Sequence, residues 1–174
     1  MSVEAVAAVD ASDLTIRPAT VGDWEAILPI FEQVVGEGET YAYPASLTSD
    51  AARDLWMEEP PGLTVVAELH GAIVGTAKLG PNRPGHGDHI GTASFMVDRS
   101  ARGAGVGRRL GEYVVDWHRR HGFEGIQFNA VVASNEAAVR LWTSLGFEIV
   151  GTVPNAFRSP RFGRVGLHVM FLAL

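Results

Sequence analysis

The most informative stretch of the sequence is Val97-Asp98-Arg99-Ser100-Ala101-Arg102-Gly103-Ala104-Gly105-Val106-Gly107-Arg108-Arg109-Leu110, between a predicted strand and a predicted amphipathic helix. Its three glycines allow a tight turn in which successive backbone N–H groups point at one spot. The following helix adds free N–H groups and a partial positive charge at its N-terminus. Arginines beside the turn add further positive charge. This combination favours a phosphate or pyrophosphate ligand.

Two common phosphate-binding motifs do not fit this stretch. A P-loop requires Gly-Lys-Ser/Thr, and the single lysine of the chain is Lys78. A dinucleotide-binding turn requires Gly-x-Gly-x-x-Gly and an acidic residue at the end of the next strand. Here the glycines follow the spacing Gly-x-Gly-x-Gly, and Glu124 precedes the next strand. The remaining alternative is a turn whose glycines serve close packing alone.

The segments around this turn alternate between strand and helix patterns. We expect strands at residues 14–17, 63–69, 73–79, 90–97, 126–132, 149–153 and 165–172, helices at 21–35, 49–58, 105–121 and 136–145, and a loop at 80–89. The pattern predicts one α+β domain with a mixed sheet over residues 13–174. Residues 1–12 are expected to form a flexible tail, since they lack the basic start of a signal peptide.

Composition and charge restrict the class of protein. A chain of 174 residues, 47% hydrophobic and 20% charged, is expected to form one hydrophobic core. It contains no cysteine, which excludes disulfides and thiol catalysis and fits a cytoplasmic location. No apolar run approaches the roughly 20 residues of a membrane span. The net charge of −6 argues against nucleic acid as a partner.

The charges are unevenly distributed along the chain. Residues 1–68 hold 13 acidic and two basic residues, whereas residues 69–174 hold seven acidic and 12 basic residues. One interpretation is a C-terminal half that meets an anion and an N-terminal half that meets a cation. The alternative is a solvated surface without a binding role.

Two motifs resemble those of one family. Arg102-x-x-Gly105-x-Gly107 resembles the acetyl-CoA signature Gln/Arg-x-x-Gly-x-Gly/Ala of the GNAT (GCN5-related N-acetyltransferase) family. The segment from Asn135 to Phe147 resembles the family helix Asn-x-x-Ala-x-x-Leu-Tyr-x-x-x-Gly-Phe. The resemblance covers about residues 14–174 and is nearest to the phosphinothricin and small amino-acid-analogue subgroups. It implies an α/β/α layered domain with about four helices and a mostly antiparallel sheet, in which strands 90–97 and 126–132 splay apart.

The resemblance implies an N-acetyltransferase that takes its acetyl group from acetyl-CoA. The pantetheine arm of acetyl-CoA would lie between the splayed strands, where a backbone N–H polarises the thioester carbonyl. Asn135 is expected to cap its own helix, with or without a contact to the cofactor. The implied cofactor-binding residues are Phe95, Met96, Val97, Arg102, Gly103, Ala104, Gly105, Val106, Gly107, Arg108 and Asn135.

The general acid of the family has no counterpart in this chain. Trp142 stands where many members carry a tyrosine that protonates the departing thiolate, and an indole N–H is not a usable acid. We expect Trp142 to pack against the cofactor or the core. Water, Tyr113 or another hydroxyl is left as the proton donor, or the thiolate leaves unprotonated.

The sequence also leaves the identity of the general base open. Thr92 matches the position of a polar residue, often a carboxylate, that acts as the base in some relatives. Threonine has no basic strength, so a water molecule held by Thr92 and Asn129 is one candidate. Glu39, Asp88 and His89 in flanking loops are the others.

The acceptor is expected to be a small amine. The segment Glu39-Thr40-Tyr41-Ala42-Tyr43-Pro44 resembles that of relatives that acetylate phosphinothricin-like amino acids, and an acidic, aromatic mouth suits an ammonium group. The predicted acceptor-binding residues are Glu39, Tyr41, Tyr43, Asn129 and Phe157, the last on a long loop. Alternatives are a protein or peptide N-acetyltransferase and a non-catalytic acyl-CoA-binding sensor.

Metal ions and further partners are the last class of predictions. His86 with His89 and His118 with His121 lie close in sequence, but neither pair has a third ligand nearby, so we expect no metal. We expect no membrane partner. The resemblance allows a homodimer.

Overall fold

The computed structural model describes residues 13–174, so the predicted tail at 1–12 lies outside the described residues. The strands and helices are β1 (Thr15–Pro18), α1 (Trp24–Glu37), α2 (Ser49–Trp56), β2 (Leu63–Leu69), β3 (Ala72–Pro81), β4 (Ile90–Val97), α3 (Val106–Arg120), β5 (Gly125–Val132), α4 (Glu136–Ser144), β6 (Glu148–Ser159) and β7 (Gly163–Ala173). Among these described residues, no helix has the length and apolar composition needed to cross a membrane.

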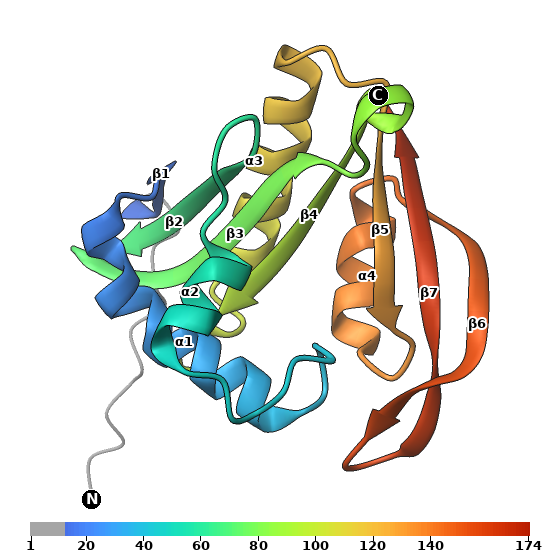
Figure 1. The fold of residues 1–174 in the computed structure, drawn as a ribbon, viewed down its shortest axis with the longest axis horizontal. Coiled ribbons are helices and arrows are strands. Elements are labelled where there is room, and N and C mark those ends of the chain that lie inside the picture. Colours follow the sequence, from blue (N-terminus) through green and yellow to red (C-terminus); the bar gives the residue numbers. More distant parts are fainter. Residues whose placement is uncertain (1–12) are drawn as a thin grey trace, which may run out of the picture.

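The seven strands form one sheet in the order β1-β2-β3-β4-β5-β7-β6 (Figure 1). Every neighbouring pair is antiparallel except β4 and β5, which are parallel. The predicted α+β domain with four helices and a mixed, mostly antiparallel sheet is confirmed.

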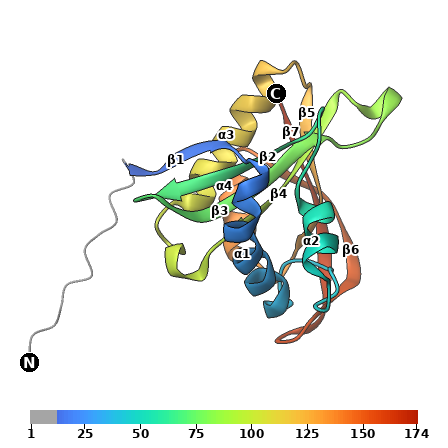
Figure 2. The same cartoon turned by 60° about the vertical axis from the view of Figure 1, so that its left-hand side comes forward.

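Helices cover both faces of the sheet (Figure 2). Because side chains alternate along a strand, Val65 and Ala67 of β2 face the core beneath α3, while Val66 faces the core beneath α1. Helix α1 packs with α2 on one face, and α3 packs with α4 on the other. The alternation therefore produces two hydrophobic clusters and fixes the layered architecture.

Strands β4 and β5 pair only at their first residues. Ile90 pairs with Gly125 and Gly91 with Ile126, and beyond this point the two strands diverge. On its other side β4 remains paired with β3 along its whole length, from Gly91 to Val97. The divergence confirms the predicted splay and opens a gap in the middle of the sheet.

Two predicted loops are partly strand. Residues 80–89 were expected to be a loop, but β3 continues to Pro81 and a short 3-10 turn occupies Gly85–Gly87. Phe157 was expected on a loop, and this is wrong: it lies in β6 and pairs with Val165 of β7. Pro154 and Asn155 suggest that a strand is interrupted at this point of the sequence. In the structure, β6 continues through them, with an irregular register between Val153 and Phe157.

Candidate functional site

The glycine-rich turn leaves β4 and opens α3. Gly103 and Gly105 have φ angles of +83° and +79°, in the left-handed region that favours glycine. A Cβ at either position would meet nothing within 4 Å, so the outer side of the turn is open. Gly107 has a different role, since a Cβ there would lie 3.3 Å from Leu141 of α4. Gly107 therefore lies in tight contact with α4, while the left-handed backbone of the turn favours glycine at the other two positions.

The turn presents a row of free backbone donors. Within residues 13–174, no hydrogen-bond acceptor reaches the N–H groups of Gly103, Gly105, Val106, Gly107 and Arg108. The first intrahelical bond of α3 is donated by Arg109 to the carbonyl of Gly105. Five free N–H groups at a helix N-terminus fit the pyrophosphate of acetyl-CoA, which the sequence motif predicts here.

Arg99, Arg102 and Arg108 of the turn have protein partners. The last residue of α1, Glu37, accepts hydrogen bonds from Arg102 at 2.7 Å and from Arg99 at 2.9 Å. Burial opposes ionisation of Glu37, but the bonds from Arg102 and Arg99 outweigh it and hold the pKa of the carboxyl below its usual value. Arg108 donates to Ser144 Oγ at 2.7 Å. The side chains of Arg102 and Arg108 are therefore held by neighbours. The backbone N–H groups remain free donors, as does the exposed side chain of Arg109 among the described residues.

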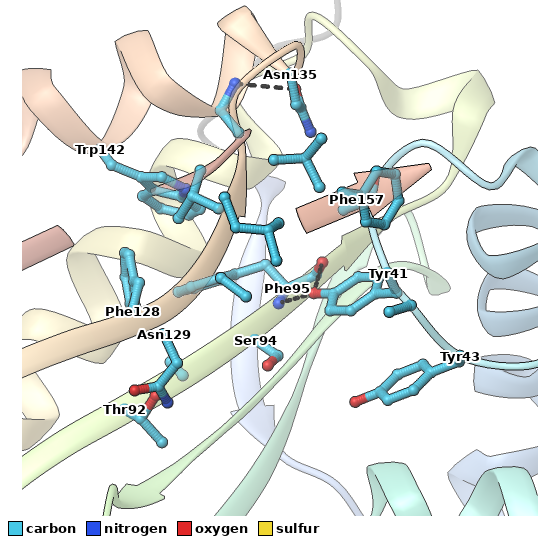
Figure 3. Close-up of a pocket in the computed structure, with 18 residues that line it drawn as sticks. Tyr41, Tyr43, Thr92, Ser94, Phe95, Phe128, Asn129, Asn135, Trp142 and Phe157 are labelled. Atoms are coloured by element: carbon cyan, nitrogen blue, oxygen red, sulfur yellow. Dashed lines mark hydrogen bonds between the residues drawn. The ribbon is translucent and has the colours of Figure 1, made fainter. Parts of the chain in front are cut away.

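A cavity of about 360 Å³ lies in the gap between β4 and β5, and we name it the gap cavity (Figure 3). Its walls come from the two splayed strands, from the α1–α2 connection and from α4. Most of the lining is apolar or aromatic, including Phe95, Phe128, Trp142 and Phe157. Its shape and position fit the pantetheine arm that the motifs predict between these strands.

Trp142 packs as expected. Its ring is 7% exposed and lies 4.5 Å from the ring centroid of Phe95 and 5.0 Å from that of Phe128. Asn135 caps α4, because its side-chain oxygen accepts from the N–H of Ala138 at 3.2 Å, and it also lines the gap cavity. The predicted cap is therefore confirmed.

Tyr41 contacts the backbone of β4 inside the gap cavity. Its hydroxyl donates to the carbonyl oxygen of Phe95 at 2.7 Å and accepts from the N–H of Phe95 at 2.8 Å. The N–H and carbonyl that Phe95 presents to the gap are thus both occupied by one phenol (Figure 3). Met96 is buried against the cluster beneath α1, and Val97 pairs with Gly75 of β3.

Thr92 and Asn129 both line the gap cavity (Figure 3). The Asn129 side chain accepts from Gln127 Nε2 at 2.9 Å and donates to Asn82 Oδ1 at 2.7 Å. A bulge in β5 between Phe128 and Val131 leaves Asn129 exposed. The predicted pair is therefore brought together, with the amide of Asn129 already bonded to two neighbours.

The three candidate bases in the flanking loops, Glu39, Asp88 and His89, do not line the gap cavity. Glu39 accepts from Ser159 Oγ at 2.6 Å and from the N–H of Arg161 at 3.0 Å. It ties the α1–α2 connection to the β6–β7 hairpin, so its predicted role as a base or acceptor contact is not supported by its position. Within residues 13–174, no three metal-ligating side chains converge.

A second cavity lies on the other side of β4, beneath the β3–β4 loop, and we name it the loop cavity. Its volume is about 660 Å³, and it shares Tyr43, Thr92, Ala93, Ser94 and Asn129 with the gap cavity. The two cavities therefore meet along the middle of β4.

Charged side chains line the loop cavity. They are Glu58, Glu59, Lys78, Arg83 and Asp88. Lys78 is paired with Glu58 at 3.1 Å, whereas Arg83 bonds only to the carbonyl of its neighbour Asn82, at 3.3 Å, within the described chain. Sequence reasoning named Asp88 as a candidate base but missed the other four, although the chain's single lysine and an arginine in a Gly/Pro-rich loop were visible signals.

Comparison with known proteins identifies the family. Residues 25–147 match the Acetyltransferase (GNAT) family, which is more than half of the chain. The chain belongs to the GNAT family. It is 52% identical to a GCN5-related N-acetyltransferase from Kribbella flavida, whose structure superimposes with a TM-score of 0.92 over 95% of this chain and 100% of that one.

Other relatives bear on the activity. An L-methionine sulfoximine/L-methionine sulfone acetyltransferase from Pseudomonas aeruginosa is 30% identical over 156 residues, 86% of this chain and 88% of that protein. The structure of yncA from Salmonella typhimurium with its cofactor acetyl-CoA is 28% identical, with a TM-score of 0.78 over 92% of this chain and 94% of that one. The matched region spans 65% of the N-acetyltransferase aca1 of Schizosaccharomyces pombe and 16% of Protein SPT10 of Saccharomyces cerevisiae.

Membership makes this chain a GNAT N-acetyltransferase, and acetyl-CoA is the donor used by the family. The free N–H groups of the turn would hold the pyrophosphate, and the gap cavity would hold the pantetheine arm. When bound, acetyl-CoA would supply the activated thioester, and the chain would supply the binding groups around it.

Replacement of Trp142 by phenylalanine tests whether this residue takes part in proton transfer. We expect Trp142→Phe to keep kcat within about tenfold of the parent, because a general acid contributes roughly 10²–10⁴ and an indole has no usable proton. Trp142→Tyr, which adds a proton donor, is expected to raise kcat. Steady-state release of CoA, measured on variants with native melting curves, checks both. A loss beyond a hundredfold in the phenylalanine variant would contradict this interpretation.

Proposed function

We propose that this enzyme transfers the acetyl group directly, in a ternary complex, to the amine of a small amino-acid-like molecule. The observation that carries the proposal is the meeting of two cavities along Thr92, Ala93 and Ser94 of β4. The gap cavity is narrow and mainly apolar, as an acyl-pantetheine arm requires. The loop cavity is lined by charges of both signs, as a zwitterionic amino acid requires.

The relatives support the same class of acceptor. The Pseudomonas aeruginosa relative is named for methionine sulfoximine and methionine sulfone, which carry both an amino and a carboxylate group. The absence of cysteine from the whole sequence removes the most nucleophilic side chain that could carry an acetyl-enzyme intermediate. Direct attack by the acceptor amine is therefore the simplest route. Thr92 and Asn129 would position the amine, or a water molecule that takes its proton, where the two cavities meet.

Initial-rate kinetics test this function. CoA release is measured with amino acids, amino-acid analogues, polyamines, aminoglycosides and peptides. We expect an amino-acid-like acceptor to give the highest kcat/KM and intersecting double-reciprocal lines when both substrates are varied. Parallel lines would indicate an acetyl-enzyme and contradict the ternary complex. A preference for peptides would favour a protein N-acetyltransferase, and binding of acetyl-CoA without release above the hydrolysis blank would favour a sensor.

We also propose that two copies of the chain associate as a homodimer. Strand β6 forms one edge of the sheet and exposes Ile149, Val150 and Val153, by 45%, 68% and 55%. An exposed edge with apolar side chains favours association with another strand or sheet. Sedimentation velocity at several protein concentrations tests whether two copies associate.

A further inference from the structure

The hydroxyl of Tyr41 bonds to backbone groups of β4 in the gap between the splayed strands. The splay of β4 from β5 leaves the N–H and carbonyl of Phe95 without a strand partner. In this chain both groups bond to the Tyr41 hydroxyl, at 2.8 and 2.7 Å. A ligand in the gap cavity therefore meets a phenol at this point of the strand.

The ring of Tyr41 is held in place by aromatic neighbours. It stacks on Tyr43 with centroids 5.3 Å apart and planes 6° apart, and it meets the edge of Trp56 at 6.0 Å and 87°. Trp56 is fully buried and donates through Nε1 to Thr76 Oγ1 at 3.0 Å. Tyr43 in turn stacks on Phe31 of α1 at 5.8 Å. Packing on two sides makes the hydroxyl a fixed feature of the cavity wall.

We propose that the Tyr41 hydroxyl is a catalytic hydrogen-bond donor to the thioester oxygen during acetyl transfer. The proposal rests on the proposed function. In the reaction, the acceptor nitrogen bonds to the carbonyl carbon while the π electron pair moves to the oxygen. The Tyr41 O–H turns from the Phe95 carbonyl to that oxygen, and the N–H of Phe95 continues to polarise the phenol. The electron pair on the oxygen then re-forms the carbonyl while the carbon–sulfur bond breaks, and CoA leaves as a thiolate. The proton of the amine passes to water.

Tyr41 remains protonated throughout this sequence. Burial raises the pKa of Tyr41 well above its ordinary value, so the phenol is a donor at every working pH and a weak acid. The Tyr41 phenol is therefore better suited to donate a hydrogen bond to the thioester oxygen than to protonate the departing thiolate. The chain's third tyrosine, Tyr113, lies outside both cavities and packs against the cluster beneath α3, so its position does not support the role of proton donor that the sequence left open for it.

Tyr41→Phe removes the hydroxyl and keeps the ring, with Tyr113→Phe as the matched control. We expect the Tyr41 variant to lower kcat by about 100-fold, the usual size for one lost oxyanion donor, and to change the KM for acetyl-CoA by less than about threefold. The control is expected to keep the parental kcat. A kcat within threefold of the parent in the Tyr41 variant overturns the proposal.

Two further readouts do not depend on turnover. Hydrogen exchange of the Phe95 amide in the free protein is expected to quicken in Tyr41→Phe, because its acceptor is gone. The infrared band of ¹³C-labelled thioester in bound acetyl-CoA is expected at lower frequency in the parent than in the variant. An identical band in both overturns the proposal, even where no acceptor is acetylated.

A second substitution keeps the test informative if Tyr41→Phe does not fold. Incorporation of 3-fluorotyrosine at position 41 preserves the ring and makes the hydroxyl a stronger donor. We expect the thioester band to move to still lower frequency, and an unmoved band contradicts the proposal. If the parent enzyme acetylates no amine but the band shifts as expected, the proposed function fails while the contact stands.

Discussion

Gly105→Asp is expected to abolish the stabilisation of the protein by acetyl-CoA. A Cβ at this position meets nothing within 4 Å, so the carboxylate fits without a clash in the turn that carries the free N–H groups. A unit charge 4 Å from a phosphate charge costs about 4 kcal/mol at an effective dielectric constant of 20, which corresponds to a roughly 1,000-fold weaker complex. A ligand at 100 times its Kd stabilises a protein by about 2.7 kcal/mol, and this stabilisation should disappear. Differential scanning fluorimetry with and without acetyl-CoA measures it.

A matched control exists at the other end of the same helix. Gly122 has a φ of +77°, and a Cβ there also meets nothing within 4 Å. Gly122→Asp therefore introduces the same backbone strain and the same charge away from the turn, and it should keep the shift caused by acetyl-CoA. Gly105→Asn, which has the same shape without the charge, should bind more tightly than the aspartate variant. A native Gly105→Asp protein with an unchanged shift would contradict the phosphate assignment.

Local features of the fold were predictable because short-range chemistry determines them. Gly103 and Gly105 occur where the chain needs a left-handed backbone, and the side chain of Asn135 caps a helix three residues away. The glycine turn and the helix cap depend on contacts within a few residues, which a sequence pattern records directly. The splay between β4 and β5 was expected only from the resemblance to the GNAT family.

Long-range polar contacts were not predictable in the same way. Glu37 and Arg102 are 65 residues apart, and Tyr41 and Phe95 are 54 residues apart. Both contacts arise because the α1–α2 connection crosses the end of β4, and this crossing is a property of the assembled sheet. Phe157 was misplaced for a related reason, since pairing with β7 overrides the local breaking effect of Pro154.

The place that we propose for the acceptor depends on the same tertiary arrangement. The acidic residues of the α1–α2 connection seemed suited to an ammonium group, but Glu37 and Glu39 are occupied by arginines and by the β6–β7 hairpin. The loop cavity instead contains an arginine whose stem packs against Gly87, where a Cβ would lie 2.8 Å from that of Arg83. Its guanidinium has only a weak bond to the Asn82 carbonyl within the described residues.

A planar guanidinium binds a carboxylate through two parallel hydrogen bonds, and each bond to a charged group contributes about 1.5–3 kcal/mol. Lys78 cannot serve in the same way, since Glu58 and the carbonyl of Leu55 already hold its ammonium group. We therefore infer that Arg83 binds the carboxylate of the acceptor in the loop cavity. The amine would then point toward the middle of β4, where the gap cavity begins.

Arg83→Glu is accordingly expected to raise the KM for the best amino-acid acceptor at least about 100-fold, because it removes a bidentate partner and adds a like charge. The KM for acetyl-CoA should stay within about threefold, and Arg119→Glu, on the exposed part of α3, should leave both values unchanged. The sharpest comparison uses the same acceptor with its carboxylate converted to an amide. Against this neutral substrate the Arg83 variant should lose less than tenfold, because no carboxylate remains to be recognised. An equal loss with both substrates would show that Arg83 supports the loop and does not contact the acceptor.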